Sequence, residues 1–326
     1  MMQSPNVRNV VKGVSSRYDY VKVRVWLGSQ YYYVLSRFSV SQILMLCRVP
    51  QKEAQKIALR LKKQLIDQGI LDIEQEHLNQ SLFQVAQSFG ISETSFQLYT
   101  KVLQFYQLQL PSIIVLYGVH QVAMTEIAGR VAERLNIYNV LDTDTVYHTW
   151  RLMKGQEESF GTSCWAYTVG QLKKQLLLND VQQNSWFSAL EENLYKSFRE
   201  GKALIIYGLF LQPISIAATL EKYSVNGKKP YFLQYWINSE LLEPQLEEEL
   251  TIEADSNITK QLYEELHDIQ LEYKKQAEMK AVPCLSIDST KDSISQVVEN
   301  IHEDYLRLIV SLSQEETKRE ESQVDT

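Results

Sequence analysis

From residue 111 onward, apolar runs alternate with stretches in which apolar residues recur at helical spacing. Ile113 to Tyr117 is an uninterrupted apolar run, which is typical of a strand buried on both faces. Ile127, Val131 and Leu135 then recur on one side of a helix. Further strands are expected at 140–141, 203–207, 231–237 and 282–287, and further helices at 186–198, 258–279 and 294–312. This alternation predicts an α/β fold with a parallel sheet wound with helices on both faces.

The residues before this region show a different pattern. Alternating residues at 18–26, a turn at 27–30 and a second run at 31–35 predict a β-hairpin. Four helices are expected after it: one capped by Ser39 or Ser41 and stopping before Pro50, one with an apolar stripe from Ala54 to Leu65, and two at 81–89 and 94–107. Residues 18–108 are therefore expected to form a small α+β module.

These patterns divide the chain into four parts. A flexible N-terminus over residues 1–17 precedes the α+β module, and the main α/β domain covers residues 109–312. Residues 313–326 are charged and lack an apolar stripe, which predicts a disordered tail.

A phosphate-binding motif is partly present between the first strand and the first helix of the main domain. The pattern G-x-x-x-x-G-K-[ST] requires two glycines, a lysine and a hydroxyl residue. Gly118 and Thr125 fill the first and last positions, but Ala123 and Met124 replace the second glycine and the lysine. Met124 brings no charge to a phosphate, and the Cβ of Ala123 obstructs the approach of an anion to the backbone. The motif therefore has the layout of a P-loop without its charge, and an ordinary strand–loop–helix unit is the alternative. His120 lies inside this loop, where it could bind phosphate, act as a base or simply pack.

Composition limits the kind of protein and its surroundings. The formal net charge of −7 argues against a nucleic-acid-binding surface. Three widely spaced cysteines indicate a reducing compartment and no metal site, and no apolar run is long enough to cross a membrane. We therefore expect a soluble intracellular protein and favour the cytoplasm. The alternative is a mitochondrial presequence, because Arg8, Lys12 and Arg17 precede the first acidic residue, Asp19.

Over residues 30–310 the chain resembles the archaeal 2-phosphoglycerate kinases and their eukaryotic relatives, which include the plant low-phytic-acid proteins. Four segments carry the resemblance, in the order in which the family has them. They are 33–65, with Tyr33-Val-Leu-Ser-Arg and Leu61-Lys-Lys-Gln-Leu; 139–151, with Thr143-Asp-Thr-Val-Tyr and Arg151; 201–213, with Gly201-Lys and Ile205-Ile-Tyr-Gly-Leu-Phe-Leu-Gln-Pro; and 269–288, with Ile269-Gln, Tyr273, Val282-Pro and Ile287-Asp. The resemblance implies a P-loop kinase-like fold for the α/β domain.

The departures from the family fall on positions that carry chemistry. Tyr207, Phe210 and Gln212 stand where the family has glutamate, histidine and aspartate. Asp144 and Arg151 are retained, and in small-molecule kinases of this type the aspartate faces the substrate and metal.

The segment between Lys229 and Lys260 lacks the arginines that family members place there. Its seven acidic residues are Glu240, Glu243, Glu247, Glu248, Glu249, Glu253 and Asp255. Negative charge of this density repels nucleotides and phosphorylated substrates, while phosphoryl transfer relies on positive charge. An ordinary solvated loop or a surface for a protein partner is the alternative.

Two functions follow from these observations. The first is a catalytically inactive relative of the kinase that serves as a structural or binding component of a larger protein assembly, with other protein subunits as partners and no cofactor. The second is an active ATP-dependent kinase of a small phosphorylated or polyol substrate, such as 2-phosphoglycerate or an inositol phosphate. In that case Thr125 and Asp144 would hold Mg²⁺, Arg151 would assist, and a lysine would come from elsewhere: Lys154, Lys173, Lys174 or Lys202. Nucleotide binding without turnover, through the backbone of Gly118–Thr125, lies between the two.

Overall fold

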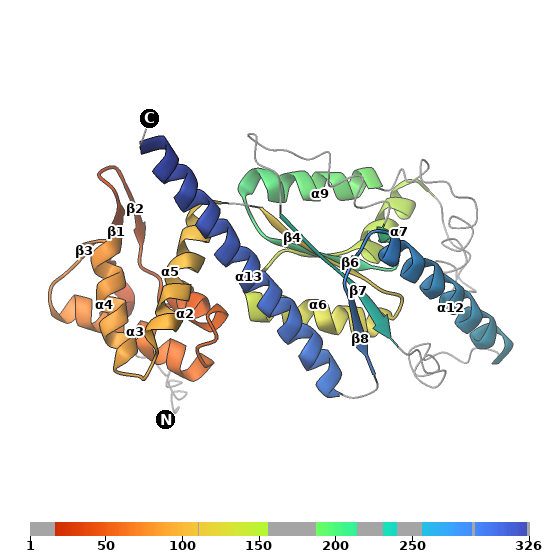
Figure 1. The fold of residues 1–326 in the computed structure, drawn as a ribbon, viewed down its shortest axis with the longest axis horizontal. Helices are drawn as coiled ribbons and strands as arrows, with labels where there is room; N and C mark the ends of the chain where they lie inside the picture. Colours follow the sequence, from red (N-terminus) through yellow and green to blue (C-terminus); the bar gives the residue numbers. More distant parts are fainter. Residues whose placement is uncertain are drawn as a thin grey trace, which may run out of the picture. The chain divides into compact units, whose positions relative to one another are not determined.

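The computed structural model describes residues 17–109, 111–155, 187–213, 231–239, 256–288 and 291–324. The chain forms two compact units, residues 1–100 and 101–326 (Figure 1). The division falls inside a helix, α5 (Glu93–Gln107), earlier than the boundary expected after residue 108. Each unit is described separately below.

The first unit combines a small sheet with helices, as its sequence predicts. Its elements are α1 (Arg17–Tyr20), β1 (Arg24–Leu27), β2 (Tyr31–Val34), α2 (Arg37–Leu46), α3 (Gln51–Asp67), β3 (Asp72–Glu74), α4 (Gln75–Gln87) and the start of α5. The sheet has the order β2-β1-β3, with β1 antiparallel to β2 and parallel to β3. Val25 of β1 and Ile73 of β3 are buried, as are Ile57 and Leu61 of α3 and Leu82 of α4, and α4 contacts both strands.

Several local predictions in this unit need correction. Residues 17–20 form a helical turn, so the hairpin's first strand begins only at Arg24. Ser36 caps α2 by accepting a hydrogen bond from the Ser39 N–H (3.3 Å), one turn before the cap positions expected at Ser39 and Ser41. Helix α4 begins at Gln75 instead of Ser81 because its first turns are mostly polar and give a weak periodic signal.

The second unit contains the predicted parallel sheet. Its elements are β4 (Ser112–Tyr117), α6 (Gln121–Leu135), β5 (Val140–Asp142), α7 (Thr143–Met153), α9 (Phe187–Glu200), β6 (Leu204–Gly208), β7 (Tyr231–Ser239), α12 (Ser256–Met279), β8 (Cys284–Ile287) and α13 (Lys291–Val324). The five strands lie in the order β5-β6-β4-β7-β8, and every pair is parallel. Strand β4 is central and all six of its residues are buried, as the uninterrupted apolar run predicts.

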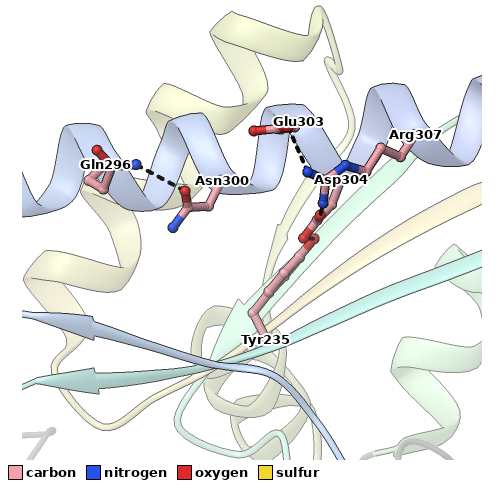
Figure 2. Close-up of polar contacts among 6 residues, drawn as sticks. All are labelled: Tyr235, Gln296, Asn300, Glu303, Asp304 and Arg307. Carbon is pink, nitrogen blue, oxygen red and sulfur yellow. Dashed lines mark hydrogen bonds and ion pairs between the residues drawn. The ribbon is translucent and has the colours of Figure 1, made fainter.

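Helices cover both faces of this sheet, which confirms the predicted α/β fold (Figure 1). Alternate residues of β4, among them Val115, pack with apolar residues of α9 and α12 such as Leu194 and Leu266. Helices α6 and α13 contact each other. Helix α6 also contacts β6, and α13 contacts β8. Tyr235 of β7 ties α13 to the sheet, because its hydroxyl donates to Asp304 Oδ2 (3.0 Å; Figure 2).

The C-terminal helix is longer than its sequence predicts. Helix α13 runs to Val324, whereas we expect it to end at Leu312 and to be followed by a disordered tail. Glutamate, glutamine, lysine and arginine, which dominate this stretch, are all good helix formers. High charge without an apolar stripe therefore does not prevent a helix from continuing here.

Candidate functional site

In open α/β sheets, ligands bind beyond the carboxyl ends of the strands, where the strand order reverses. Strand β4 occupies this position, since its successor β5 lies on one side of it and β7 on the other. The chain leaves β4 at Tyr117, turns through Gly118 to His120 and enters α6 at Gln121. The predicted strand–loop–helix unit is therefore present at the edge of the sheet where a ligand would bind.

His120 ends this loop as the N-cap of α6. Its Nδ1 accepts a hydrogen bond from the backbone N–H of Ala123 (3.2 Å), and its own carbonyl accepts one from Met124 N (2.9 Å). A helix N-terminus attracts anions through N–H groups that lack an intrahelical partner. The His120 ring therefore uses one of the donors that a phosphate would need.

The Met124 side chain points back against the start of the loop. Met124 is buried, with 2% of its surface exposed. A Cβ placed on Gly118 would lie 2.5 Å from the Met124 Sδ and 3.3 Å from the Ile237 carbonyl oxygen. Glycine at 118 therefore makes room for a thioether of the protein itself.

The side chain of Thr125, at the hydroxyl position of the motif, is hydrogen-bonded to a tyrosine. Thr125 is exposed at the start of α6, and a hydrogen bond joins its side chain to Tyr207 at the end of β6. Desolvation raises the pKa of Tyr207, so its hydroxyl is neutral at physiological pH. Tyr207 stands where the resemblance places a glutamate, which means that the Thr125 hydroxyl faces a neutral partner at this point.

Asp144 lies in the first turn of α7 and is almost completely buried (3% exposed). Its Oδ1 accepts hydrogen bonds from the backbone N–H groups of Leu209 (2.9 Å) and Phe210 (3.4 Å) and from the Thr143 hydroxyl (3.5 Å). Its Oδ2 has no hydrogen-bond partner among the described residues. Desolvation by burial, followed by the nearby charge of Asp142, raises the pKa of Asp144 to about 7.

Gly208 allows this arrangement to form. A Cβ at Gly208 would overlap the Thr143 Oγ1 and lie 2.8 Å from the Asp144 Oδ1, and its φ of +141° disfavours any side chain. The Thr143 hydroxyl also donates to the Tyr207 carbonyl (3.1 Å). Hydrogen bonds therefore connect the end of β6 and the turn after it to the start of α7.

Aromatic rings and a buried arginine line the inner side of α7. The ring of Phe210 stacks on Tyr147 with a centroid separation of 3.9 Å. Arg151, two turns after Asp144, is also buried (5% exposed), and its guanidinium lies 6.0 Å from the centre of the Tyr147 ring. Phe210 stands where the resemblance places a histidine, so a stacked hydrocarbon ring occupies that position.

The structure places two of the four candidate replacement lysines away from this site. Lys202 precedes β6, at the opposite end of the strand, and its Nζ forms an ion pair with Glu200 (2.7 Å). Lys154 follows α7, ten residues after Asp144 along the helix, which corresponds to about 15 Å. Lys173 and Lys174 lie outside the described residues, as do the acidic positions of 240–255.

Three residues of the site were not singled out from the sequence as site residues. Asp142 caps α7 by accepting hydrogen bonds from the Asp144 N–H and the Thr145 hydroxyl (both 2.9 Å), and the D-T-D-T spacing is a capping signal that could have revealed it. Tyr273 of α12 donates to the Leu209 carbonyl, and Trp236 meets the Tyr273 ring edge-on with centroids 6.1 Å apart. Burial, and secondarily the charge of Asp144, raises the pKa of Tyr273. No local pattern reveals these two contacts, because α12 is distant in sequence.

Over the described ranges, no group of three or more His, Cys, Asp or Glu side chains is placed to hold a metal ion. The helices within those ranges also include none with the length and apolarity of a membrane span.

These features define an α/β protein with a strand–loop–helix unit at the ligand-binding edge of a parallel sheet. The chain is similar to the 2-phosphoglycerate kinase of Methanopyrus kandleri, with 28% identity over 135 residues. This match covers 41% of the chain and 41% of the relative. A dephospho-CoA kinase from Campylobacter jejuni matches in structure over 61% of this chain and 98% of its own, with a TM-score of 0.36 and 10% identity. No protein-family model matches the chain. At a coarse level, therefore, the similarity is to kinases.

Proposed function

We propose that this chain is a catalytically inactive relative of 2-phosphoglycerate kinase that acts as a structural or binding component of a larger protein assembly. The observation that carries the proposal is the position of Met124: it stands at the lysine position of the motif, and its buried thioether packs against Gly118 at the start of the loop. The residue at this motif position normally supplies a positive charge to the β- and γ-phosphates. Here it supplies an apolar group that is already buried in protein.

The surrounding groups support the same proposal. Phosphoryl transfer is catalysed mainly by positioned charge, and one well-placed electrostatic donor contributes about 3–4 kcal/mol. Asp144, the carboxylate that would face a metal in such a site, is 3% exposed, and burial raises its pKa. Asp144 instead fixes the backbone after β6 through the amides of Leu209 and Phe210. Asp144 therefore acts here as a structural residue.

Calorimetric titration of the purified chain with Mg·ATP and Mg·ADP tests the proposal. We expect no binding heat from the native protein. The double variant Met124→Lys/Ala123→Gly restores the motif and is expected to gain nucleotide binding. The matched control is Val122→Lys, which adds the same charge to the same turn of α6 at a position that is 54% exposed.

The control distinguishes specific binding of the nucleotide phosphates by the loop from general attraction of the nucleotide to an added positive charge. Binding gained by the double variant and not by Val122→Lys would support a loop that retains its shape without its charge. Micromolar binding of nucleotide by the native protein would overturn the proposal. Thermal unfolding of each variant, measured in parallel, shows whether a lysine is tolerated at the buried position of Met124.

A second candidate is an active kinase of 2-phosphoglycerate or an inositol phosphate. It is favoured by Asp144, whose Oδ2 has no hydrogen-bond partner among the described residues and could bind Mg²⁺ together with Thr125. Phosphate transfer from ATP to either substrate, lost in Asp144→Asn, would support this candidate. The same assay without transfer, together with absent nucleotide binding, would exclude it.

A further inference from the structure

The outer edge of the small sheet in the first unit lacks the usual protection against pairing. Strand β2 lies at the end of the order β2-β1-β3, and within the described part of this unit no strand pairs with its outer edge. Its residues are Tyr31, Tyr32, Tyr33 and Val34, with neither a charged residue nor a proline. Natural edge strands usually carry lysine, proline or a bulge, because an open edge is a template for another strand.

The hydrogen-bond register shows which backbone groups face outward. Leu35 N donates to the Val23 carbonyl (2.8 Å), so these two residues form a hydrogen-bonded pair. In an antiparallel ladder hydrogen-bonded and non-hydrogen-bonded pairs alternate from there. Trp26↔Tyr32 and Arg24↔Val34 are therefore the non-hydrogen-bonded pairs. Consistently, Arg24 N donates away from β2, to the Leu71 carbonyl (2.8 Å). The N–H and C=O groups of Tyr32 and Val34 thus point outward.

Three of the four side chains of β2 are exposed, and none of the four is charged. The exposed fractions are 72% for Tyr31, 51% for Tyr32 and 45% for Val34. The Tyr32 ring packs beside Trp26, with centroids 5.0 Å apart, and the Arg24 guanidinium lies 5.8 Å from the centre of the Tyr32 ring. Exposed tyrosines and a partly buried tryptophan beside an open strand edge are typical of a protein interface.

We propose that a second copy of this chain pairs with β2, antiparallel and two-fold symmetric about Tyr33. In this register Tyr32 of each copy lies opposite Val34 of the other, and the two pairs exchange four backbone hydrogen bonds through the outward-facing groups. A tyrosine beside a β-branched residue is a favourable cross-strand pair. The resulting sheet has six strands and no free edge at either β2.

The absence of charge on β2 favours a second copy of this chain as the partner strand. Two copies of a strand that carries charge of one sign repel each other, but residues 30–36 contain no charged residue. Arg24, the nearest cation in the same row of the sheet, is neutralised by Asp72 at 2.6 Å. The strand is therefore self-complementary, as a symmetric interface requires. A pairing of this length buries less than a standard interface, so we expect a weak, reversible dimer with micromolar affinity.

Sedimentation velocity of the full chain over a wide concentration range tests the proposal, which does not depend on whether nucleotide binds. The native chain should show a monomer–dimer equilibrium. Tyr32→Lys/Val34→Lys, which places lysines opposite each other across the pair, should weaken it at least about tenfold. Leu59→Lys is the matched control, because Leu59 is 46% exposed but lies on α3. A chain that remains monomeric throughout, or a dimer affected equally by both variants, would overturn the proposal.

Cysteine cross-linking tests the register directly and does not require the lysine variants to fold. In the proposed pairing the two copies of residue 33 lie directly opposite, with Cα atoms about 4.5 Å apart, which suits a disulfide. The two copies of residue 31 lie about 13 Å apart along the strands. Oxidation should therefore cross-link Tyr33→Cys and leave Tyr31→Cys at the level of the native chain. Equal cross-linking of the two variants would contradict this pairing.

Discussion

At the scale of single residues, Gly208 has the least freedom of the positions around the candidate site. Its backbone φ of +141° is one that side chains rarely adopt, and the Thr143 hydroxyl and Asp144 carboxylate occupy the space where a Cβ would project. Both the conformation and the contacts thus require glycine here. Gly129, in the middle of α6, has no atom within 4 Å of the corresponding point.

These two glycines give opposite expectations for the same substitution. Gly208→Ala should lower the free energy of unfolding by about 2 kcal/mol or more, because of backbone strain and the displacement of Asp144. Gly129→Ala should raise it by roughly 0.5–1 kcal/mol through helix propensity. Urea denaturation measures both values. Similar effects of the two substitutions would show that the turn after β6 is not held as described.

The contact between Met124 and Gly118 can be measured by a double-mutant cycle. Gly118→Ala should destabilise the protein, since its Cβ would lie 2.5 Å from the Met124 Sδ. In the Met124→Ala background the same substitution should cost less, with a coupling of about 0.5–3 kcal/mol typical of residues in contact. Equilibrium unfolding of the four proteins provides the measurement. Strict additivity would place the Met124 side chain elsewhere and remove the main support for an occupied loop.

At the scale of elements, the sequence predicts best the segments whose pattern is set by burial. The central strand and the amphipathic helices α3, α6 and α12 lie where their apolar spacing places them. Strand β3 was missed, because only Ile73 of its three residues is apolar and its neighbours belong to helices. Pairing with β1, distant in sequence, makes it a strand.

The candidate site is predictable to a similar degree. Gly118, Thr125 and Asp144 could be found from motif spacing because the strand–loop–helix unit that positions them is local. The burial of Met124, the bond between Thr125 and Tyr207, and the raised pKa of Asp144 depend on β6, the turn after it and β7 packing against that unit. Such contacts join distant parts of the chain, so no local pattern reports them.

The attachment of α13 to the sheet gives a prediction at this scale. The Tyr235 hydroxyl donates to Asp304, which also pairs with Arg307 at 3.2 Å (Figure 2). Tyr235→Phe should cost about 1.5–3 kcal/mol, the range for a hydrogen bond to a charged group. Tyr195→Phe on α9, where the tyrosine is 52% exposed, should be close to neutral. In the Asp304→Asn background the cost of Tyr235→Phe should fall, and chemical denaturation would show whether it does.

At the scale of the whole molecule, the buried carboxyl group makes stability depend on pH in an unusual direction. Most acidic groups in folded proteins have lowered pKa values, so stability is lost as the pH falls. The pKa of Asp144 is raised from 3.8 to about 7, so in this range the native state retains a proton that the unfolded chain has released. The contribution of Asp144 to stability is therefore greatest below about pH 4, decreases between about pH 4 and pH 7, and is constant above that.

Asp144→Asn isolates this contribution, because the amide keeps an acceptor oxygen for Leu209 and Phe210 but does not titrate. From about pH 4 to about pH 8, the native protein should lose roughly 4 kcal/mol of unfolding free energy relative to the variant. Urea denaturation of both proteins at a series of pH values measures this difference. Asp142→Asn is the matched comparison: it removes the nearby charge and should lower the pKa of Asp144, so the decrease should be smaller and should end at a lower pH. Curves for the native protein and Asp144→Asn that stay parallel across this range would mean that Asp144 is ionised in the folded protein, and its role as a metal ligand would then become the better interpretation.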